Sequence, residues 1–169
     1  PGLDGDDAAG ASLRREVAAR IGAAKQREFD TLGVVLGYRY EGSPVIVADG
    51  TPAAPHDYIN YVPSARPGNL APHAWLHDGS SLYDHFGDGF TLLCLGARDG
   101  DGPDAARAAA REIGVPLTVI APTEGALPQL YGARYTLIRP DQHVAWRGDE
   151  WPADGFGLFV RITGRGVTR

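Results

Sequence analysis

Histidine and carboxylate side chains that could bind a metal crowd between residues 73 and 88. They are His73, His77, Asp78, Asp84, His85 and Asp88. A His-x-x-x-His pair such as His73 and His77 shares a metal when both side chains lie on one helix face. Pro72 and the pair Asp78–Gly79 instead favour an extended or turning backbone. Hydrogen bonds from His73 to the loop backbone, and capping of the following helix by Asp78, explain the same residues. The sequence therefore assigns no metal ligand.

Two serines in the same window could serve as hydrolytic nucleophiles. Ser80 and Ser81 lie beside Asp84 and His85, and these are the residue types of a Ser-His-Asp triad. No Gly-x-Ser-x-Gly motif surrounds either serine, and the candidate partners are sequence neighbours on a short helix rather than residues that converge from separate elements. The sequence therefore assigns no catalytic residue.

A glycine-rich turn between a predicted strand and a predicted helix could bind a nucleotide. Residues Gly100–Ala105 match a Gly-x-Gly-x-x-Ala fingerprint, with Glu124 roughly where a ribose-binding acid would fall. Three carboxylates would face the pyrophosphate, namely Asp99, Asp101 and Asp104. Pro103 also lacks a backbone N–H that the phosphate needs. We interpret the segment as a solvated turn capping a helix, and the sequence assigns no cofactor-binding residue.

The chain has one cysteine, Cys94, inside the apolar run FTLLCLG. It cannot form an internal disulfide, and the start of the helix after the first strand reads ARDGDGPD, without a Cys-x-x-Cys motif. Disulfide exchange is excluded on these grounds, and Cys94 is interpreted as a buried small hydrophobic residue. An unpaired thiol also fits a reducing cytoplasm.

The composition indicates a soluble cytoplasmic protein. The 169 residues carry a formal net charge of −5 without a basic stripe, which disfavours a nucleic acid as partner. No run approaches the ~18 apolar residues of a membrane span, so no membrane association is predicted. The sequence lacks methionine and starts in a Gly/Asp-rich segment. This indicates a piece of a longer polypeptide, with removal of an initiator Met before Pro1 as the alternative.

The elements of the first 70 residues are irregularly spaced. Apolar residues three or four positions apart predict an amphipathic helix over Ser12–Asp30 with Ser12 as N-cap, and its apolar stripe needs a partner surface. β-Branched and aromatic residues predict strands over Leu32–Tyr40 and Pro44–Ala48. Residues 49–70 have no period and predict a long connection, with a domain boundary near Val62–Pro67.

Beyond residue 80 the predicted elements alternate regularly. They are a short helix at Ser81–Phe86, strand Phe90–Leu95, helix Pro103–Ile113 ending at Gly114, strand Leu117–Ile120, one or two helical turns within Thr123–Gly132, a hairpin of Tyr135–Ile138 and His143–Trp146, and a final helix over Pro152–Ile162. This is the order of a thioredoxin-like α/β fold with one helix reduced. A right-handed crossover would make the first two strands parallel, and the two long helices are expected to cover both faces of the mixed sheet.

Two motifs give the chain a family resemblance. YVPSARPGNLAPHAWLHDGSSLYDHFGDG at residues 61–89 and RPDQHVAWRG at residues 139–148 resemble the C-terminal region of FAD-dependent aromatic hydroxylases, the class A flavoprotein monooxygenases that include phenol and polyketide hydroxylases. LGYRYEGSP at Leu36–Pro44 is similar to the family as well, and the resemblance runs from about Leu13 to Gly164. The family usually has Arg where this chain has Leu70, so no salt bridge from that position is carried over.

The resemblance implies a three-domain enzyme of which this chain is the end. Family members join a Rossmann-type FAD domain, a sheet-rich substrate domain and a thioredoxin-like domain without redox cysteines. Residues 1–61 then correspond to the tail of the substrate domain plus a linker, and residues 62–169 to the thioredoxin-like domain. The family's FAD-binding motifs are missing here, so FAD and NAD(P)H are expected to bind outside this segment. The segment alone is expected to be inactive.

The leading hypothesis is therefore the C-terminal portion of an FAD-dependent monooxygenase that hydroxylates a polycyclic aromatic natural product with O2 and NAD(P)H. An aromatic polyketide or an indolocarbazole precursor would place it in antibiotic biosynthesis. Its partners would be the remaining domains and the aromatic substrate, and a homodimer is compatible with the sequence. The alternative is a stand-alone, non-catalytic thioredoxin-like binding or scaffold module. A metal-dependent enzyme using His73, His77 and Asp78 ranks third.

Overall fold

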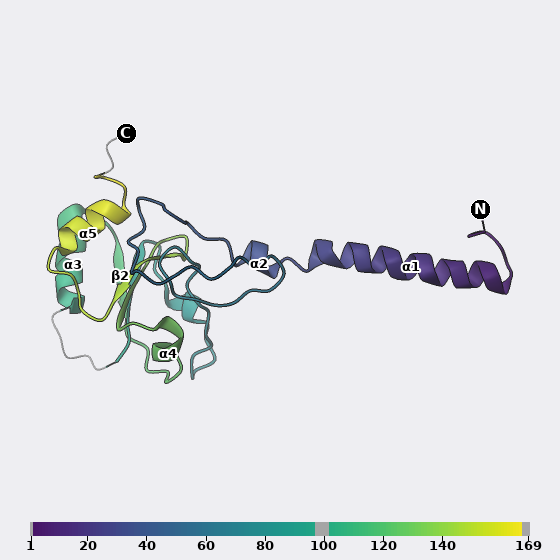
Figure 1. Cartoon of the computed structure of the whole chain (residues 1–169). Coiled ribbons are helices and arrows are strands. Elements are labelled where there is room, and N and C mark those ends of the chain that lie inside the picture. Colours follow the sequence, from purple (N-terminus) through teal and green to yellow (C-terminus); the bar gives the residue numbers. More distant parts are fainter. Residues whose placement is uncertain (1, 97–101, 167–169) are drawn as a thin grey trace. The chain divides into compact units, whose positions relative to one another are not determined.

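The computed structural model describes residues 2–96 and 102–166 (Figure 1). Its contacts divide the chain into two compact units. The first holds residues 1–37 and 56–61, and the second holds residues 38–55 and 62–169. No helix among the described residues is both long and apolar enough to cross a membrane.

The first unit begins with α1 (Ala8–Phe29), which starts four residues before the predicted helix. The side chain of Asp7 accepts a hydrogen bond from the Gly10 N–H at 2.7 Å and is the N-cap. Ser12, the predicted cap, lies inside the first turns. The prediction was wrong because the apolar period begins only at Leu13, whereas alanine and glycine at residues 8–11 allow the helix to start at the stronger aspartate cap.

The predicted strand Leu32–Tyr40 is also wrong, since it starts as a short helix, α2 (Leu32–Val35). Gly33 explains the change because its N–H donates to the carbonyl of Ile59 at 3.3 Å. A Cβ at Gly33 would lie 1.8 Å from the carbonyl oxygen of Asp57. Close backbone packing thus overrides the strand preference of the valines. Pro44–Ala48 is no strand either, and Val47 makes a single backbone hydrogen bond to Ala145 at 2.9 Å.

The second unit is built on a four-stranded mixed sheet in the order β2-β1-β3-β4. The strands are β1 (Phe90–Cys94), β2 (Leu117–Ile120), β3 (Tyr135–Ile138) and β4 (Val144–Gly148). β1 runs parallel to β2 and antiparallel to β3, and β3 and β4 form a hairpin. The four strands predicted beyond residue 80, the parallel pair and the hairpin are confirmed. β1 ends at Cys94 rather than Leu95, and β4 runs from residue 144 to 148 rather than 143 to 146.

Helices cover the sheet differently from the prediction. α3 (Gly102–Ile113) and α5 (Gly155–Ile162) lie side by side (Figure 1) and pack on the same face. The opposite face carries α4 (Leu127–Tyr131), the 3-10 helix η1 (Leu82–His85) and residues 65–76. α5 starts three residues later than predicted because the side chain of Asp154 accepts from Gly157 N–H at 2.7 Å and caps it there.

Alternation along the strands divides the core into two layers. The layer under α3 and α5 contains the buried residues Leu92, Leu137, Ala110, Phe159 and Ile162. The layer on the other face contains Leu93, Ile138, Val144, Leu127 and Tyr131. Both faces of this small sheet are therefore covered, as a mixed sheet with a parallel pair requires.

Candidate functional site

The histidine and carboxylate window forms a tight loop followed by η1. Ser81 is the N-cap of η1, with its Oγ accepting from Tyr83 N–H at 3.1 Å and Asp84 Oδ2 accepting from Ser81 N–H at 3.1 Å. Asp78 does not cap η1 but holds the turn before it, because its Oδ1 accepts a hydrogen bond from Ser80 N–H at 2.9 Å. Asp84 and Ser81 thus form a reciprocal capping box, which is a structural role.

His73 and His77, which were considered as metal ligands and not assigned, have separate hydrogen-bond partners. His73 Nε2 lies 3.0 Å from Ser81 Oγ, and His77 Nδ1 lies 3.2 Å from Glu124 Oε1. Within residues 2–96 and 102–166, no group of three or more His, Cys, Asp or Glu side chains is placed to hold a metal. The third hypothesis, a metal site of His73, His77 and Asp78, gains no support from this geometry.

The geometry of Ser80 is that of a hydrogen-bond donor to a carboxylate. Its Oγ lies 2.6 Å from Asp78 Oδ1 and 2.8 Å from His85 Nε2. Hydrogen bonds from Ser80 hold the pKa of Asp78 below its usual value, and an ionised carboxylate only accepts. The hydroxyl hydrogen therefore points to Asp78, and His85 Nε2 must donate to Ser80 Oγ. A base would need a free lone pair on that nitrogen, so His85 does not activate Ser80.

The Pro-Gly part of the first motif anchors a loop to the sheet. Gly68 N–H donates to the Val144 carbonyl at 2.8 Å, and its own carbonyl accepts from Tyr40 N–H at 3.0 Å. Gly68 has a φ of 95°, which favours glycine. Further along, the hydroxyl of buried Tyr131 donates to the Pro72 carbonyl at 2.7 Å. These residues fix the loop against the face that carries α4.

The second motif forms a compact cluster at the β3–β4 turn. His143 is fully buried, and the rings of Tyr38 and Tyr40 lie 4.8 Å and 4.7 Å from its ring. Arg139 Nε and Nη2 donate to the carboxylate of Asp141 at 3.1 Å and 3.0 Å. Burial alone would raise the pKa of Asp141, but Arg139 and the His143 N–H hold it below its usual value. The cluster stabilises the β3–β4 turn.

Arg147 connects three segments of the second unit. Its Nε donates to Asp49 Oδ2 at 2.6 Å, its Nη1 to the carbonyl of Tyr131 at 2.8 Å, and its Nη2 to Thr51 Oγ1 at 3.0 Å. The Arg147 and Asp49 side chains are only 16% and 17% exposed. The pair joins residues 98 positions apart, so no local pattern in the sequence could have revealed it.

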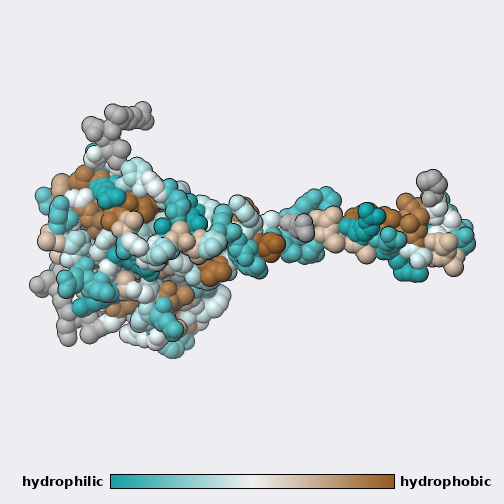
Figure 2. Space-filling view, in the orientation of Figure 1, coloured by the Kyte–Doolittle hydropathy of each residue, from teal (hydrophilic) through white to brown (hydrophobic). Residues whose placement is uncertain are grey.

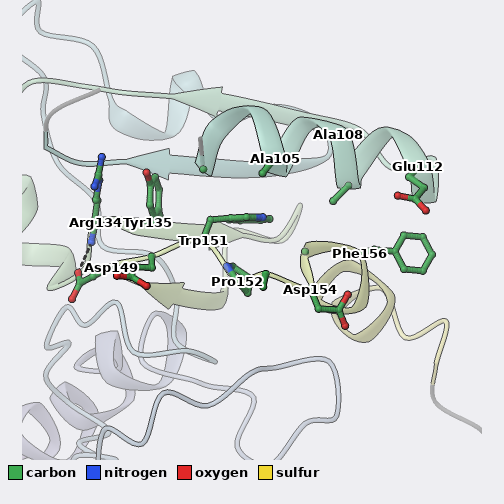
Figure 3. A pocket seen from close by; sticks show the side chains of 15 residues that line it. Ala105, Ala108, Glu112, Arg134, Tyr135, Asp149, Trp151, Pro152, Asp154 and Phe156 are labelled. Carbon is green, nitrogen blue, oxygen red and sulfur yellow. Dashed lines mark hydrogen bonds between the residues drawn. The ribbon is translucent and has the colours of Figure 1, made fainter. Parts of the chain in front are cut away.

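A cavity of about 590 Å³ lies between α3 and the segment that leads into α5. Figure 3 shows the Trp151 ring lying across it, with Glu112 on α3 and Phe156 on α5. Four carboxylates line it, namely Glu112, Asp149, Glu150 and Asp154. Two of them are engaged, because Asp149 accepts from Arg134 N–H at 3.0 Å and Asp154 caps α5. None of the described lining residues is a histidine, cysteine, serine or lysine.

Cys94 is the last residue of β1, at the carboxyl end of that strand. Cys94 lines a cavity of about 420 Å³ there, together with Arg107. Burial raises the pKa of the Cys94 thiol to about 11. The candidate nucleotide fingerprint Gly100–Ala105, with Asp99 and Asp101, lies partly outside the described residues. Asp104 lies within them and pairs with Arg107 at 3.0 Å.

We expect Cys94 to react slowly with thiol reagents. With a pKa of about 11, only about 1 thiol in 10⁴ is ionised at pH 7, and the thiolate is the nucleophile. Timed labelling with a disulfide reagent should therefore be far slower than labelling of free cysteine, and should accelerate to the free rate in urea. Labelling of the folded chain at the free rate would contradict this geometry.

Comparison with known proteins shows the family to which this chain is similar. The family model described as aromatic-ring hydroxylase, C-terminal, matches residues 64–161. The FAD-dependent monooxygenase opdD of Penicillium oxalicum is 32% identical over 152 residues, covering 88% of this chain and 29% of that protein. The aklavinone 12-hydroxylase RdmE of Streptomyces purpurascens is 39% identical over 147 residues, covering 80% and 27%.

A solved structure extends the similarity to three dimensions. The rebeccamycin biosynthetic enzyme RebC with reduced flavin is similar with a TM-score of 0.80 at 38% identity, covering 97% of this chain and 30% of that chain. This chain thus spans less than a third of the length of these relatives.

Proposed function

The chain belongs to the family of aromatic-ring hydroxylase C-terminal domains, and from this premise we propose that it is the C-terminal portion of an FAD-dependent monooxygenase. The proposed reaction inserts one oxygen atom of O2 into an aromatic ring, with NAD(P)H as reductant. FAD supplies the oxygen-transfer chemistry when bound. The observation that carries the proposal is the similarity to RebC over 97% of the chain.

A polycyclic aromatic natural product is the substrate class that the relatives support. Two of them are named as an aklavinone hydroxylase and a rebeccamycin biosynthetic enzyme. We infer a role in antibiotic biosynthesis on that basis. The use of NAD(P)H and the single cysteine also support a cytoplasmic location.

The cavity beside Trp151 does not fit the pyrophosphate of FAD. The cavity beside Trp151 is lined by four carboxylates and one arginine, and a pyrophosphate there would meet mostly like charge. Ser81, Asp84 and Arg139 of the two family motifs form capping and turn hydrogen bonds, whereas the buried Tyr61 hydroxyl, Asn69 Oδ1 and His143 Nε2 have no partner among the described residues. We therefore propose that FAD and NAD(P)H bind in the remaining domains of the enzyme, and that this segment is structural rather than catalytic.

The domain assignment forms part of the proposal. We assign residues 1–61 to the tail of the substrate domain with its linker, and residues 62–169 to a thioredoxin-like domain without redox cysteines. The strand order β2-β1-β3-β4 with a parallel β1–β2 pair supports the second part of this assignment. Residues 38–55, which the proposal places in the linker, belong by their contacts to the second unit.

The proposed reaction is tested with the native enzyme and ¹⁸O2. We expect NAD(P)H oxidation that depends on an aromatic substrate, a flavin absorption spectrum, and a product that has gained one ¹⁸O atom. Label arriving from water instead of O2, or turnover without a bound flavin, would exclude a flavin monooxygenase.

A non-catalytic role for the first motif makes a separate prediction. The double substitution Ser80→Ala with His85→Ala, made in the native enzyme, should leave kcat within about twofold, since these side chains bond to each other and to Asp78. Loss of a true general acid or base lowers the rate about 10²–10⁴-fold. Such a loss, with the flavin content unchanged, would show that the motif takes part in the reaction.

A further inference from the structure

The helix α2 is apolar on every side, although it lies near the surface. Its sequence is LGVV, and Gly33 is the position that packs against the backbone of Asp57 and Asn60. The other three side chains are exposed, with Leu32 at 59%, Val34 at 48% and Val35 at 58%. A helix that is hydrophobic all round is normally buried in a larger protein.

The segment that packs on α2 adds two more apolar side chains. Tyr58 is 64% exposed and Ile59 is 49% exposed. The Asp57 carboxylate holds this turn, accepting from Ile59 N–H and Asn60 N–H at 2.9 Å each and from Asn60 Nδ2 at 3.0 Å. The α2 patch is defined as Leu32, Val34, Val35, Tyr58 and Ile59. Figure 2 shows apolar surface in the region where Figure 1 labels α2.

The chemistry of the α2 patch indicates what it binds. None of its five side chains carries a charge. The neighbouring carboxylate of Asp57 already accepts three hydrogen bonds, so it needs no basic partner. The matching surface is therefore apolar, and the contact should depend little on salt.

The length of the relatives indicates where that surface is. This chain covers only 27–30% of them, and the matched family model is the C-terminal one. We propose that the α2 patch docks on the rest of the longer polypeptide that the proposed function implies, and that Gly33 shapes this docking surface. The inference rests on the proposed function, because that function makes this chain part of a longer polypeptide.

Hydroxyl-radical footprinting of the native protein tests the proposal without any variant. After correction for intrinsic reactivity, we expect the five patch residues to be labelled as weakly as Leu92 and Leu93, which are 0% exposed. The protection should persist on dilution and in 1 M salt. Labelling that matches exposures of 48–64% would overturn the proposal. So would protection lost on dilution, because a second copy would then be the occupant.

A matched pair of glycine substitutions gives the second arm. In Gly33→Ala the new Cβ would lie 1.8 Å from the Asp57 carbonyl, whereas at Gly22, within α1, nothing lies within 4 Å. We expect Gly33→Ala to raise labelling of Tyr58 and Ile59 at least about threefold in native enzyme, as expected for local opening. Gly22→Ala should leave it unchanged. Unchanged labelling in both variants overturns the role of Gly33.

The outcomes separate this inference from the proposed function. A protected α2 patch in a polypeptide that holds no flavin would leave docking intact but remove the monooxygenase. A flavin-bearing enzyme with an exposed α2 patch would overturn the docking but leave the monooxygenase function intact. A native species of 169 residues without a partner would overturn both.

Discussion

Replacing Phe159 with alanine is expected to lower the free energy of unfolding by about 3–5 kcal/mol, the usual cost of removing a buried aromatic ring. Phe159 is 0% exposed, and its ring contacts those of Phe90 and Trp151 at centroid distances of 5.9 Å and 6.2 Å. It joins α5 to the sheet layer beneath α3. Truncation would leave a cavity that this rigid helix pair cannot collapse to fill.

Phe156→Ala is the matched control, because Phe156 lies on the same helix but is 41% exposed. Its expected cost is below about 1 kcal/mol. Urea unfolding followed by tryptophan fluorescence measures both, since all three tryptophans lie in the second unit. Equal midpoints for the two variants would show that α5 does not pack on the sheet as described.

Arg147→Ala is expected to cost about 3 kcal/mol at neutral pH. The substitution removes three hydrogen bonds, because the guanidinium donates to Asp49, to Thr51 and to the Tyr131 carbonyl. It also leaves the carboxylate of Asp49, which is 17% exposed, without its cation. The connection from residue 49 to 51 would then detach from β4 and α4.

Arg107→Ala is the control for the loss of a cation. Arg107 pairs with Asp104 at 3.0 Å, but the two side chains are 45% and 90% exposed. An exposed pair contributes about 0–1 kcal/mol. If Arg107→Ala and Arg147→Ala lowered the free energy of unfolding in urea equally, the buried hydrogen bonds of Arg147 would not be the source of its effect.

The effect of Arg147→Ala should also depend on pH. Burial alone would raise the pKa of Asp49, but hydrogen bonds from Thr51 and Arg147 hold it below its usual value. A carboxyl group whose pKa is lower in the folded state stabilises the fold above its unfolded pKa of about 3.9, and that stabilisation is lost as pH falls through the folded pKa. The difference between wild type and Arg147→Ala should therefore shrink between pH 7 and pH 3. A constant difference would exclude an ionic role.

Local patterns were sufficient to predict most of the second unit. Leu117–Ile120 and Tyr135–Ile138 were predicted with the observed bounds, because each is a short apolar run between turn residues. The helix before Gly114 was predicted because alanines and a glycine stop mark it locally. The α/β class and the parallel strand pair followed from the order of these elements.

The first unit could not be predicted in the same way. Val34 and Val35 favour a strand locally, yet Gly33 packs against Asp57 and Asn60, more than 20 residues further along the chain. That contact is tertiary, so the residues next to Gly33 in the sequence give no sign of it. For the same reason, the sequence did not reveal the Arg147–Asp49 pair or the tilted ring contacts of His143 with Tyr38 and Tyr40.

The chemical roles of the motif side chains depend on distances that the sequence does not show. Ser80 and His85 were recognised as neighbours from the sequence. The direction of the hydroxyl hydrogen, however, follows from the 2.6 Å distance to Asp78 together with the lowered pKa of that carboxyl group. The family motif thereby indicates the enzyme class, and we propose that it supplies no reacting group.

Native mass spectrometry of the protein isolated from its organism tests the central claim most directly. A C-terminal portion of an FAD-dependent monooxygenase predicts one polypeptide about three times as long as this chain, by comparison with the 27–30% coverage of its relatives, with FAD bound. A mature species of 169 residues without flavin and without a flavoprotein partner would contradict it.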